Sequence, residues 1–151
     1  MTPADTELLI DLIAGKHECL LGLRDLSRRQ QALIDLGDTT SLLTLLAAKQ
    51  RQIERLQETE RRLDRFRHDD PERRVWSSAA ERTRCASLAE QSARLLAEVM
   101  ETERRCEESL RRRRDETAEQ LAVVHSAGMA RGAYLDAAGE SRSTFDLTAE
   151  T

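Results

Sequence analysis

Histidine and cysteine are the first candidates for chemistry in this sequence, because their side chains ligate metals and transfer protons. His17 and Cys19 are two residues apart on an expected helix, so their side chains point in different directions. His68 and His125 stand in two other elements. A metal site would require these separate groups to converge by accident, so we expect no metal site and no cofactor.

The cysteines give no second route to catalysis. Cys19, Cys85 and Cys106 are an odd number at unrelated spacings, which argues against a disulfide framework and is usual for small buried residues. The sequence has no glycine-rich phosphate loop, no nucleophile elbow and few loops that could hold a catalytic site. We therefore expect that the chain is not an enzyme.

The strongest basic patch is the run Arg111 to Arg114. Glu107 and Glu108 precede it, Asp115 and Glu116 follow it, and four consecutive arginines surround a helix instead of lining one side. The formal charge of the whole chain is −4, with both signs interspersed. These features predict a solvated helix surface and no binding of nucleic acid.

The first residues give no sign of a membrane segment. They lack a basic n-region, and the apolar run from Leu8 to Ala14 is interrupted by Asp11. We expect no membrane insertion and a cytoplasmic location.

The composition predicts an all-α protein with a narrow core. Charged residues make up 34% of the chain and aromatic residues 3%, and there are only 6 glycines and 2 prolines. Leucine and alanine supply most of the apolar content. This pattern is typical of long amphipathic helices, and we expect three of them, antiparallel, as a helical hairpin plus a longer third helix in a coiled-coil-like bundle.

The first two helices are expected over about residues 3–36 and 40–68. Apolar residues recur in both at intervals of three, four and seven. Gly37 suits the left-handed position after a helix, and Asp38 or Thr40 can cap the helix that follows. The turn is short, so the second helix should fold back on the first.

The third helix is expected to start at Pro71 or at Ser78 and to end near Ser126. Asp70 can cap the first of these starts, and Ser78 with Glu81 forms a candidate capping box at the second. One heptad-like seam is predicted along this helix. It comprises Cys85, Ala89, Leu96, Val99, Cys106, Leu110, Leu121 and Val124.

The predicted seam is weak in its middle, where Glu103, Arg113 and Thr117 replace apolar residues. At about 1.5 Å per residue the first two helices span roughly 45 Å and the third about 70 Å. The distal end of the third helix must therefore kink back, pair with a second copy or remain available to another protein. We expect a bundle over residues 1–127 and a flexible tail over residues 128–151.

Residues 8–63 contain a helix of leucine pairs followed by LGDTTSLLTLLAAKQRQIERLQ, where a small polar turn precedes a leucine-rich helix with an AxKQ-type centre. This stretch resembles the start of the FlgN family of flagellar export chaperones. The family continues with a long helix and a mobile C-terminal end, and LAEQSARLLAEVMETERRC and the tail fit that order. The stretch ERRCEESLRRRRDE is more charged than the family pattern.

The resemblance implies a non-enzymatic cytoplasmic chaperone. Its partners would be hook-associated proteins, which join hook and filament, and components of the flagellar type III export apparatus. In the family, the C-terminal region holds a helical segment of the client. Carried over to this chain, the client-binding residues would be Leu110, Leu121, Val124 and Met129, followed in the tail by Tyr134, Leu135, Phe145 and Leu147.

A second interpretation fits the same heptads. The chain could be a self-associating coiled-coil scaffold, or an adaptor with no flagellar role, because heptads alone do not separate the two classes. A tight dimer would favour the scaffold, whereas a monomer or weak homodimer would favour the chaperone.

Overall fold

The structure, a computed structural model, describes the backbone of residues 2–149 and the side chains of residues 2–139. Within that range it contains three long helices, one short 3-10 helix and no strand, which confirms the all-α prediction. The helices are α1 (Pro3–Leu36), α2 (Thr39–Arg67), η1 (Pro71–Arg73) and α3 (Ala79–Ala149). The chain divides into two units, Met1–Ser109 and Leu110–Thr151, and each is described by itself.

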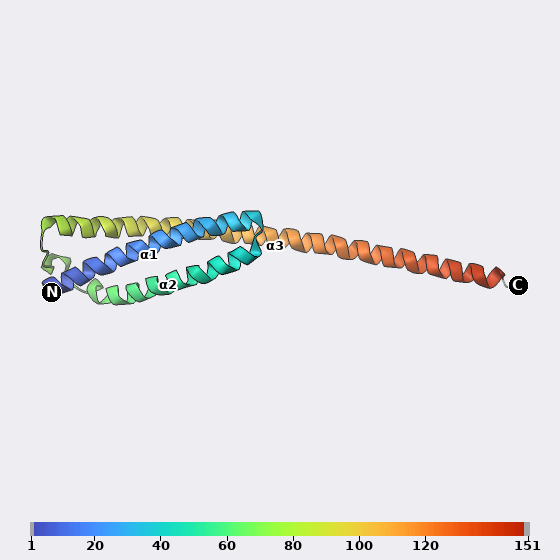
Figure 1. The fold of residues 1–151 in the computed structure, drawn as a ribbon, viewed down its shortest axis with the longest axis horizontal. Coiled ribbons are helices and arrows are strands. Elements are labelled where there is room, and N and C mark those ends of the chain that lie inside the picture. Colours follow the sequence, from blue (N-terminus) through green and yellow to red (C-terminus); the bar gives the residue numbers. More distant parts are fainter. Residues whose placement is uncertain (1, 150–151) are drawn as a thin grey trace. The chain divides into compact units, whose positions relative to one another are not determined.

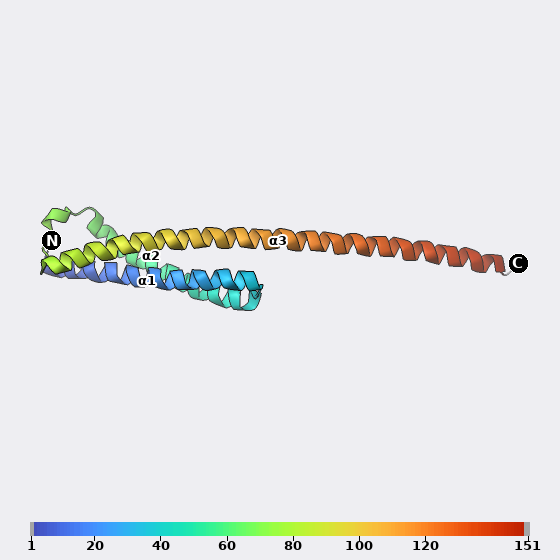
Figure 2. The same ribbon diagram turned by 90° about the horizontal axis from the view of Figure 1, so that it is seen from above.

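The first unit is an antiparallel bundle. Helices α1 and α2 form a hairpin, and the first part of α3 lies alongside it, as Figure 1 and Figure 2 both show. Each helix of this unit is amphipathic and buries one face against the other two.

Local signals fix both ends of α1. The Thr2 hydroxyl accepts a hydrogen bond from the Asp5 backbone at 3.2 Å, and the Asp5 carboxylate accepts one from the Thr2 backbone at 3.0 Å. This reciprocal capping box satisfies amide groups that have no partner in the first turn. Gly37 ends the helix with a φ of 71°, a left-handed conformation that a residue with a Cβ adopts only under strain.

The other helix starts also follow side-chain caps. Asp38 accepts from the Ser41 backbone at 3.1 Å and opens α2, so Asp38, of the two candidates, is the cap. Ser78 accepts from the Glu81 backbone at 3.1 Å and opens α3. The earlier candidate start holds only η1, whose cap is Asp70. The second of the two predicted starts of the third helix is therefore the correct one.

Two apolar clusters hold the bundle together. The first joins the start of α1 to the end of α2 through Leu9, Leu12, Leu63 and Phe66, with Trp76 packed against them. The second joins all three helices and is formed by Leu20, Leu23, Leu95 and Val99, with Ile53 and Leu56 beside them. Each fully buried side chain of this size contributes roughly 1.5 to 3 kcal/mol.

The register of α3 in this core differs from the predicted seam. Leu95 is buried and Leu88 half-buried, whereas Ala89 and Leu96 are exposed. The predicted seam was therefore wrong by one residue in this part of α3. The composition does not distinguish adjacent leucines, and packing against α1 and α2 decides which one is buried.

The prediction that the third helix ends near Ser126 was also wrong, because the helical backbone continues to Ala149. No proline follows Pro71, and alanine, leucine, arginine and glutamate favour the helix. A glycine within a helix costs about 1 kcal/mol but does not end it. The flexibility of residues 128–151 stays a prediction.

Candidate functional site

A polar layer crosses the interior of the bundle and takes residues from all three helices. We define it as Ser27 and Gln30 of α1, Lys49 of α2 and Glu103 of α3. The Lys49 ammonium pairs with the Glu103 carboxylate and donates to the Gln30 amide oxygen at 2.9 Å. The Ser27 hydroxyl donates to the same Glu103 oxygen at 2.9 Å. Glu103, a poor residue for an apolar seam, is therefore the shared acceptor of this layer.

The polar layer favours one register of the helices over others. Ser27, Gln30 and Lys49 are buried, while the Glu103 side chain keeps 35% of its surface exposed. A slip of α2 or α3 by one turn would separate the buried Lys49 ammonium from the Glu103 carboxylate, which costs a few kcal/mol. We assign the layer a structural role, as polar groups within coiled coils often have.

The three cysteines are buried, as the sequence analysis expected of small residues in a helical core, and all three are free. Burial raises the pKa of the Cys85 and Cys106 thiols, which lowers their thiolate fraction. The Cys106 thiol contacts the Ser27 carbonyl oxygen at 3.9 Å. Among the residues that the structure describes, no group of three or more His, Cys, Asp or Glu side chains could hold a metal ion.

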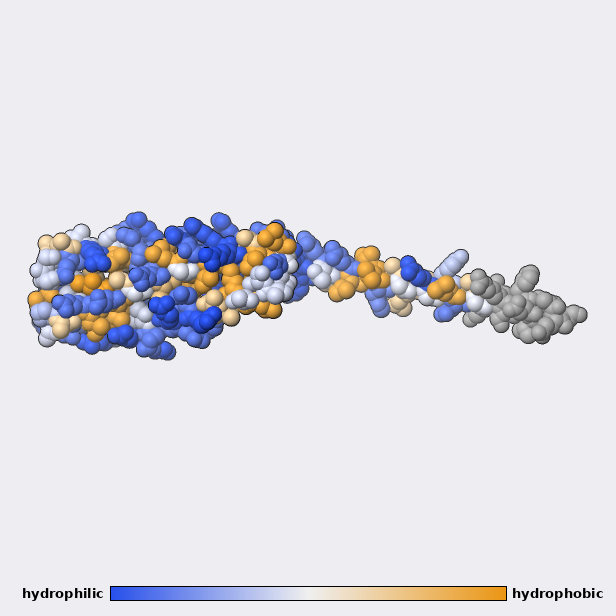
Figure 3. All heavy atoms as spheres, viewed as in Figure 1, coloured by the Kyte–Doolittle hydropathy of each residue, from blue (hydrophilic) through white to orange (hydrophobic). Residues whose placement is uncertain are grey.

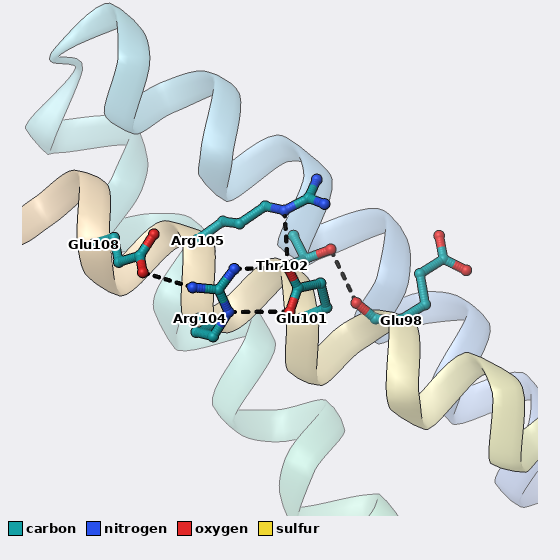
Figure 4. Close-up of polar contacts among 6 residues, drawn as sticks. All are labelled: Glu98, Glu101, Thr102, Arg104, Arg105 and Glu108. Atoms are coloured by element: carbon teal, nitrogen blue, oxygen red, sulfur yellow. Dashed lines mark hydrogen bonds and ion pairs between the residues drawn. The ribbon is translucent and has the colours of Figure 1, made fainter.

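A cluster of ion pairs covers the surface of α3 just before the second unit (Figure 4). Arg104 donates to Glu101 at 2.8 and 3.0 Å and to Glu108 at 2.5 Å, and Arg105 donates to Glu101 at 3.2 Å. The hydrogen bond and charge of Arg104, with Arg105 beside it, lower the pKa of Glu101 to about 2. These arginines pair along their own helix, as expected of a solvated helix surface.

The second unit exposes large apolar side chains on one face of α3. Leu110, Leu121, Val124 and Leu135 have exposed fractions of 42%, 64%, 67% and 61%. At 3.6 residues per turn, these four positions lie within about 60° of one another around the helix. Apolar side chains are visible on the described part of this unit in Figure 3. Four of the predicted client-binding residues therefore share one exposed face.

The remaining predicted site residues are not brought onto that face. Met129 and Tyr134 are exposed, with fractions of 65% and 75%, but lie roughly 100° or more away from Leu110 around the helix. Phe145 and Leu147 belong to the helical backbone of α3, and their side chains lie outside the described residues.

The exposed face also contains residues that were not predicted to bind a client. We use the term distal seam for the inner heptad positions of this part of α3. They are Leu110, Arg114, Thr117, Leu121, Val124, Gly128, Arg131, Leu135 and Ala138. Two arginines therefore interrupt the apolar face. A Cβ added to Gly128 would meet nothing within 4 Å. The seam thus offers a shallow position in its middle, where a large side chain of a partner could approach the backbone.

The distal seam is offset from the seam that packs in the bundle. The buried seam of α3 includes Val99 and Cys106, and its heptads would continue through Arg113 and Gln120, which are polar. The large apolar residues of the second unit lie one position further along, beginning at Leu110. The heptad pattern of apolar residues in the second unit is therefore shifted by one residue from the pattern in the first.

A groove on the α1–α2 hairpin was not predicted from the sequence. It lies between the end of α1 and the start of α2, has a volume of about 550 Å³ and is lined mainly by Leu26, Leu33, Thr44, Leu45 and Ala48. The sequence signal was the width of the apolar stripe on α1, which holds more leucines than one neighbouring helix can cover.

A smaller pocket of about 220 Å³, open to solvent, is lined in part by Leu63, Phe66 and Ser92. The Ser92 hydroxyl is buried and has no hydrogen-bond partner among the protein atoms described.

No family model, curated protein or solved structure was found to match the chain. No helix among the described residues is both long enough and apolar enough to cross a membrane.

Proposed function

We propose that the chain is a non-enzymatic cytoplasmic export chaperone. It binds hook-associated proteins, the proteins at the junction of flagellar hook and filament, and delivers them to the flagellar type III export apparatus. The client class comes from the resemblance of residues 8–63 to the FlgN family. The binding mode comes from the second unit, whose distal seam takes a helical segment of the client by helix-in-groove docking.

One observation carries this proposal. Leu121, Val124 and Leu135 share a helix face and remain more than half exposed. Apolar faces of this kind mark interaction sites in proteins that act through partners. Each such side chain is worth roughly 1.5 to 3 kcal/mol when fully buried, and association itself costs at least about 4 kcal/mol. We therefore expect a moderate, releasable affinity, which suits a chaperone that must hand over its client.

Two adjacent valines provide a matched test. Val123 and Val124 have exposed fractions of 68% and 67%, but only Val124 lies on the distal seam. A carboxylate in place of the valine removes apolar contact with the client and must be desolvated on docking. The two effects together reduce the binding free energy by about 2 to 4 kcal/mol, which is roughly 30- to 1000-fold in affinity. Val124→Asp should weaken binding of a purified hook-associated protein by at least 30-fold, and Val123→Asp by less than threefold. Binding is measured by isothermal titration calorimetry.

Equal effects of the two substitutions would contradict docking on the distal seam. Absence of binding by the unmodified chain would contradict the client class. A dimer that persists at nanomolar concentration in sedimentation would favour the scaffold interpretation instead.

A further inference from the structure

The distal seam has a charge pattern as well as an apolar one. Arg114 and Arg131 occupy inner positions of the seam, 17 residues and about 25 Å apart along the helix. Acidic residues of this segment lie at outer heptad positions, as Asp115, Glu119 and Asp136 do. The docking face is therefore apolar and basic. Its nearest carboxylate is that of Asp115, which the Arg114 guanidinium contacts at 3.4 Å in an ion pair that is largely exposed and so contributes little.

This pattern disfavours a second copy as the occupant. In a parallel pair in register, Arg114 would face Arg114 of the copy, and Arg131 would face its own equivalent. In the antiparallel register that pairs Leu110 with Leu135 and Leu121 with Val124, Arg114 would face Arg131 twice. Like charges at inner positions destabilise a coiled coil and select against that pairing.

We propose that the helix that docks on the distal seam carries carboxylates facing Arg114 and Arg131. This inference rests on the proposed function, in which the seam binds a helical client, and it names the chemistry of that client. The partner is an amphipathic helix of about 28 residues with leucine-type side chains against Leu121, Val124 and Leu135. It carries two Asp or Glu residues 17 positions apart on the same face. Arginine pairs well with carboxylates at such contacts, since its guanidinium is planar and remains charged.

The same peptide pattern serves both helix directions. In a parallel pair, each inner heptad position, a or d, faces the same position of the partner helix. In an antiparallel pair, a faces d and d faces a. The spacing between the two carboxylates is 17 residues in either case. The direction of the client helix therefore does not need to be known for the test.

The test uses the full chain and two labelled synthetic peptides. Both are 28-residue leucine-seam helices, identical except that the positions facing Arg114 and Arg131 hold glutamate in one and lysine in the other. Fluorescence anisotropy at 50 mM NaCl should show the glutamate peptide binding at least tenfold more tightly. The difference should shrink at 0.5 M NaCl, because salt screens partly exposed ion pairs.

A charge swap identifies the residues responsible. The double variant Arg114→Glu with Arg131→Glu should prefer the lysine peptide. Arg112→Glu, at an outer heptad position of the same arginine run, is the matched control and should keep the preference for glutamate. Equal binding of the two peptides, or a preference that the double variant does not reverse, would overturn the inference, as would failure of both peptides to bind.

The inference and the proposed function fail in different ways. One outcome is that Val124→Asp abolishes binding of a hook-associated protein while the double variant Arg114→Glu with Arg131→Glu leaves that binding unchanged. In that case the proposed function stands, and the inference that the client helix is acidic is refuted. If the glutamate peptide binds as described and no hook-associated protein does, the seam chemistry stands and the client class does not. A dimer that the glutamate peptide cannot dissociate would mean that a second copy covers the seam, which overturns the inference.

Discussion

Replacing Glu103 by alanine removes the acceptor that Ser27 and Lys49 share in the polar layer. The Lys49 ammonium would remain buried with only the Gln30 oxygen, 2.9 Å away, as its partner. Breaking a fully buried ion pair costs about 3 to 5 kcal/mol. Because 35% of the Glu103 side chain is exposed, water can reach the vacated position, and we expect a loss of about 2 to 3 kcal/mol in the free energy of unfolding.

The assay is urea unfolding followed by the fluorescence of Trp76, the single tryptophan, which packs against the first apolar cluster and so reports the bundle. Lys49→Met alone should cost about 1 to 2 kcal/mol, since the remaining carboxylate is partly hydrated. The double variant Lys49→Met with Glu103→Leu replaces the pair by apolar groups and should be within about 1 kcal/mol of the unmodified chain. A loss below about 0.5 kcal/mol for Glu103→Ala, or strictly additive losses in the double variant, would refute this account of the layer.

Three further outcomes are expected. Gly128→Ala and Gly132→Ala should each raise helix content measured by circular dichroism and stabilise the helix by up to about 1 kcal/mol, since a Cβ meets no neighbour at either position; unchanged helicity would contradict this. The pKa of Glu101 is lowered from 4.5 to about 2 by Arg104, so the stability that this pair contributes is present above about pH 4.5 and lost as the pH falls toward 2. Glu101→Gln should accordingly lose less stability than the unmodified chain between pH 5 and pH 2 in acid titrations. Ser92→Ala should raise the free energy of unfolding by about 0.5 to 1 kcal/mol, because it removes a buried hydroxyl without a protein partner; a loss of stability would show that a bound water satisfies that group.

Local signals made most of the fold predictable. Gly37 and Asp38 mark a helix end and a helix start through backbone conformation and capping, and neither depends on distant contacts. The apolar spacing then predicted three amphipathic helices, and the bundle buries Leu9, Leu20 and Leu63 of the first two. These features are encoded within a few residues, and the sequence therefore reveals them.

The register and the length of α3 were not predictable in the same way. Leu95 and Leu96 are adjacent and chemically identical, and only packing against α1 and α2 buries the first. The helix beyond Ser126 lacks an apolar stripe as regular as that of the bundle, so periodicity gave no reason to extend it. Its continuation depends on intrinsic propensity, which periodicity does not measure.

The offset between the two seams of α3 also bears on the proposed site. If the heptads of Val99 and Cys106 continued in step, the seam beyond Ser109 would contain Arg113 and Gln120. A seam in that register would be polar. The shift by one residue instead presents Leu121 and Val124 on a face with its own pattern of arginines. An apolar face interrupted by like charges associates poorly with a second copy of itself and well with a helix of opposite charge. The two arginines that weaken self-association as a coiled coil are therefore the feature that would select the partner.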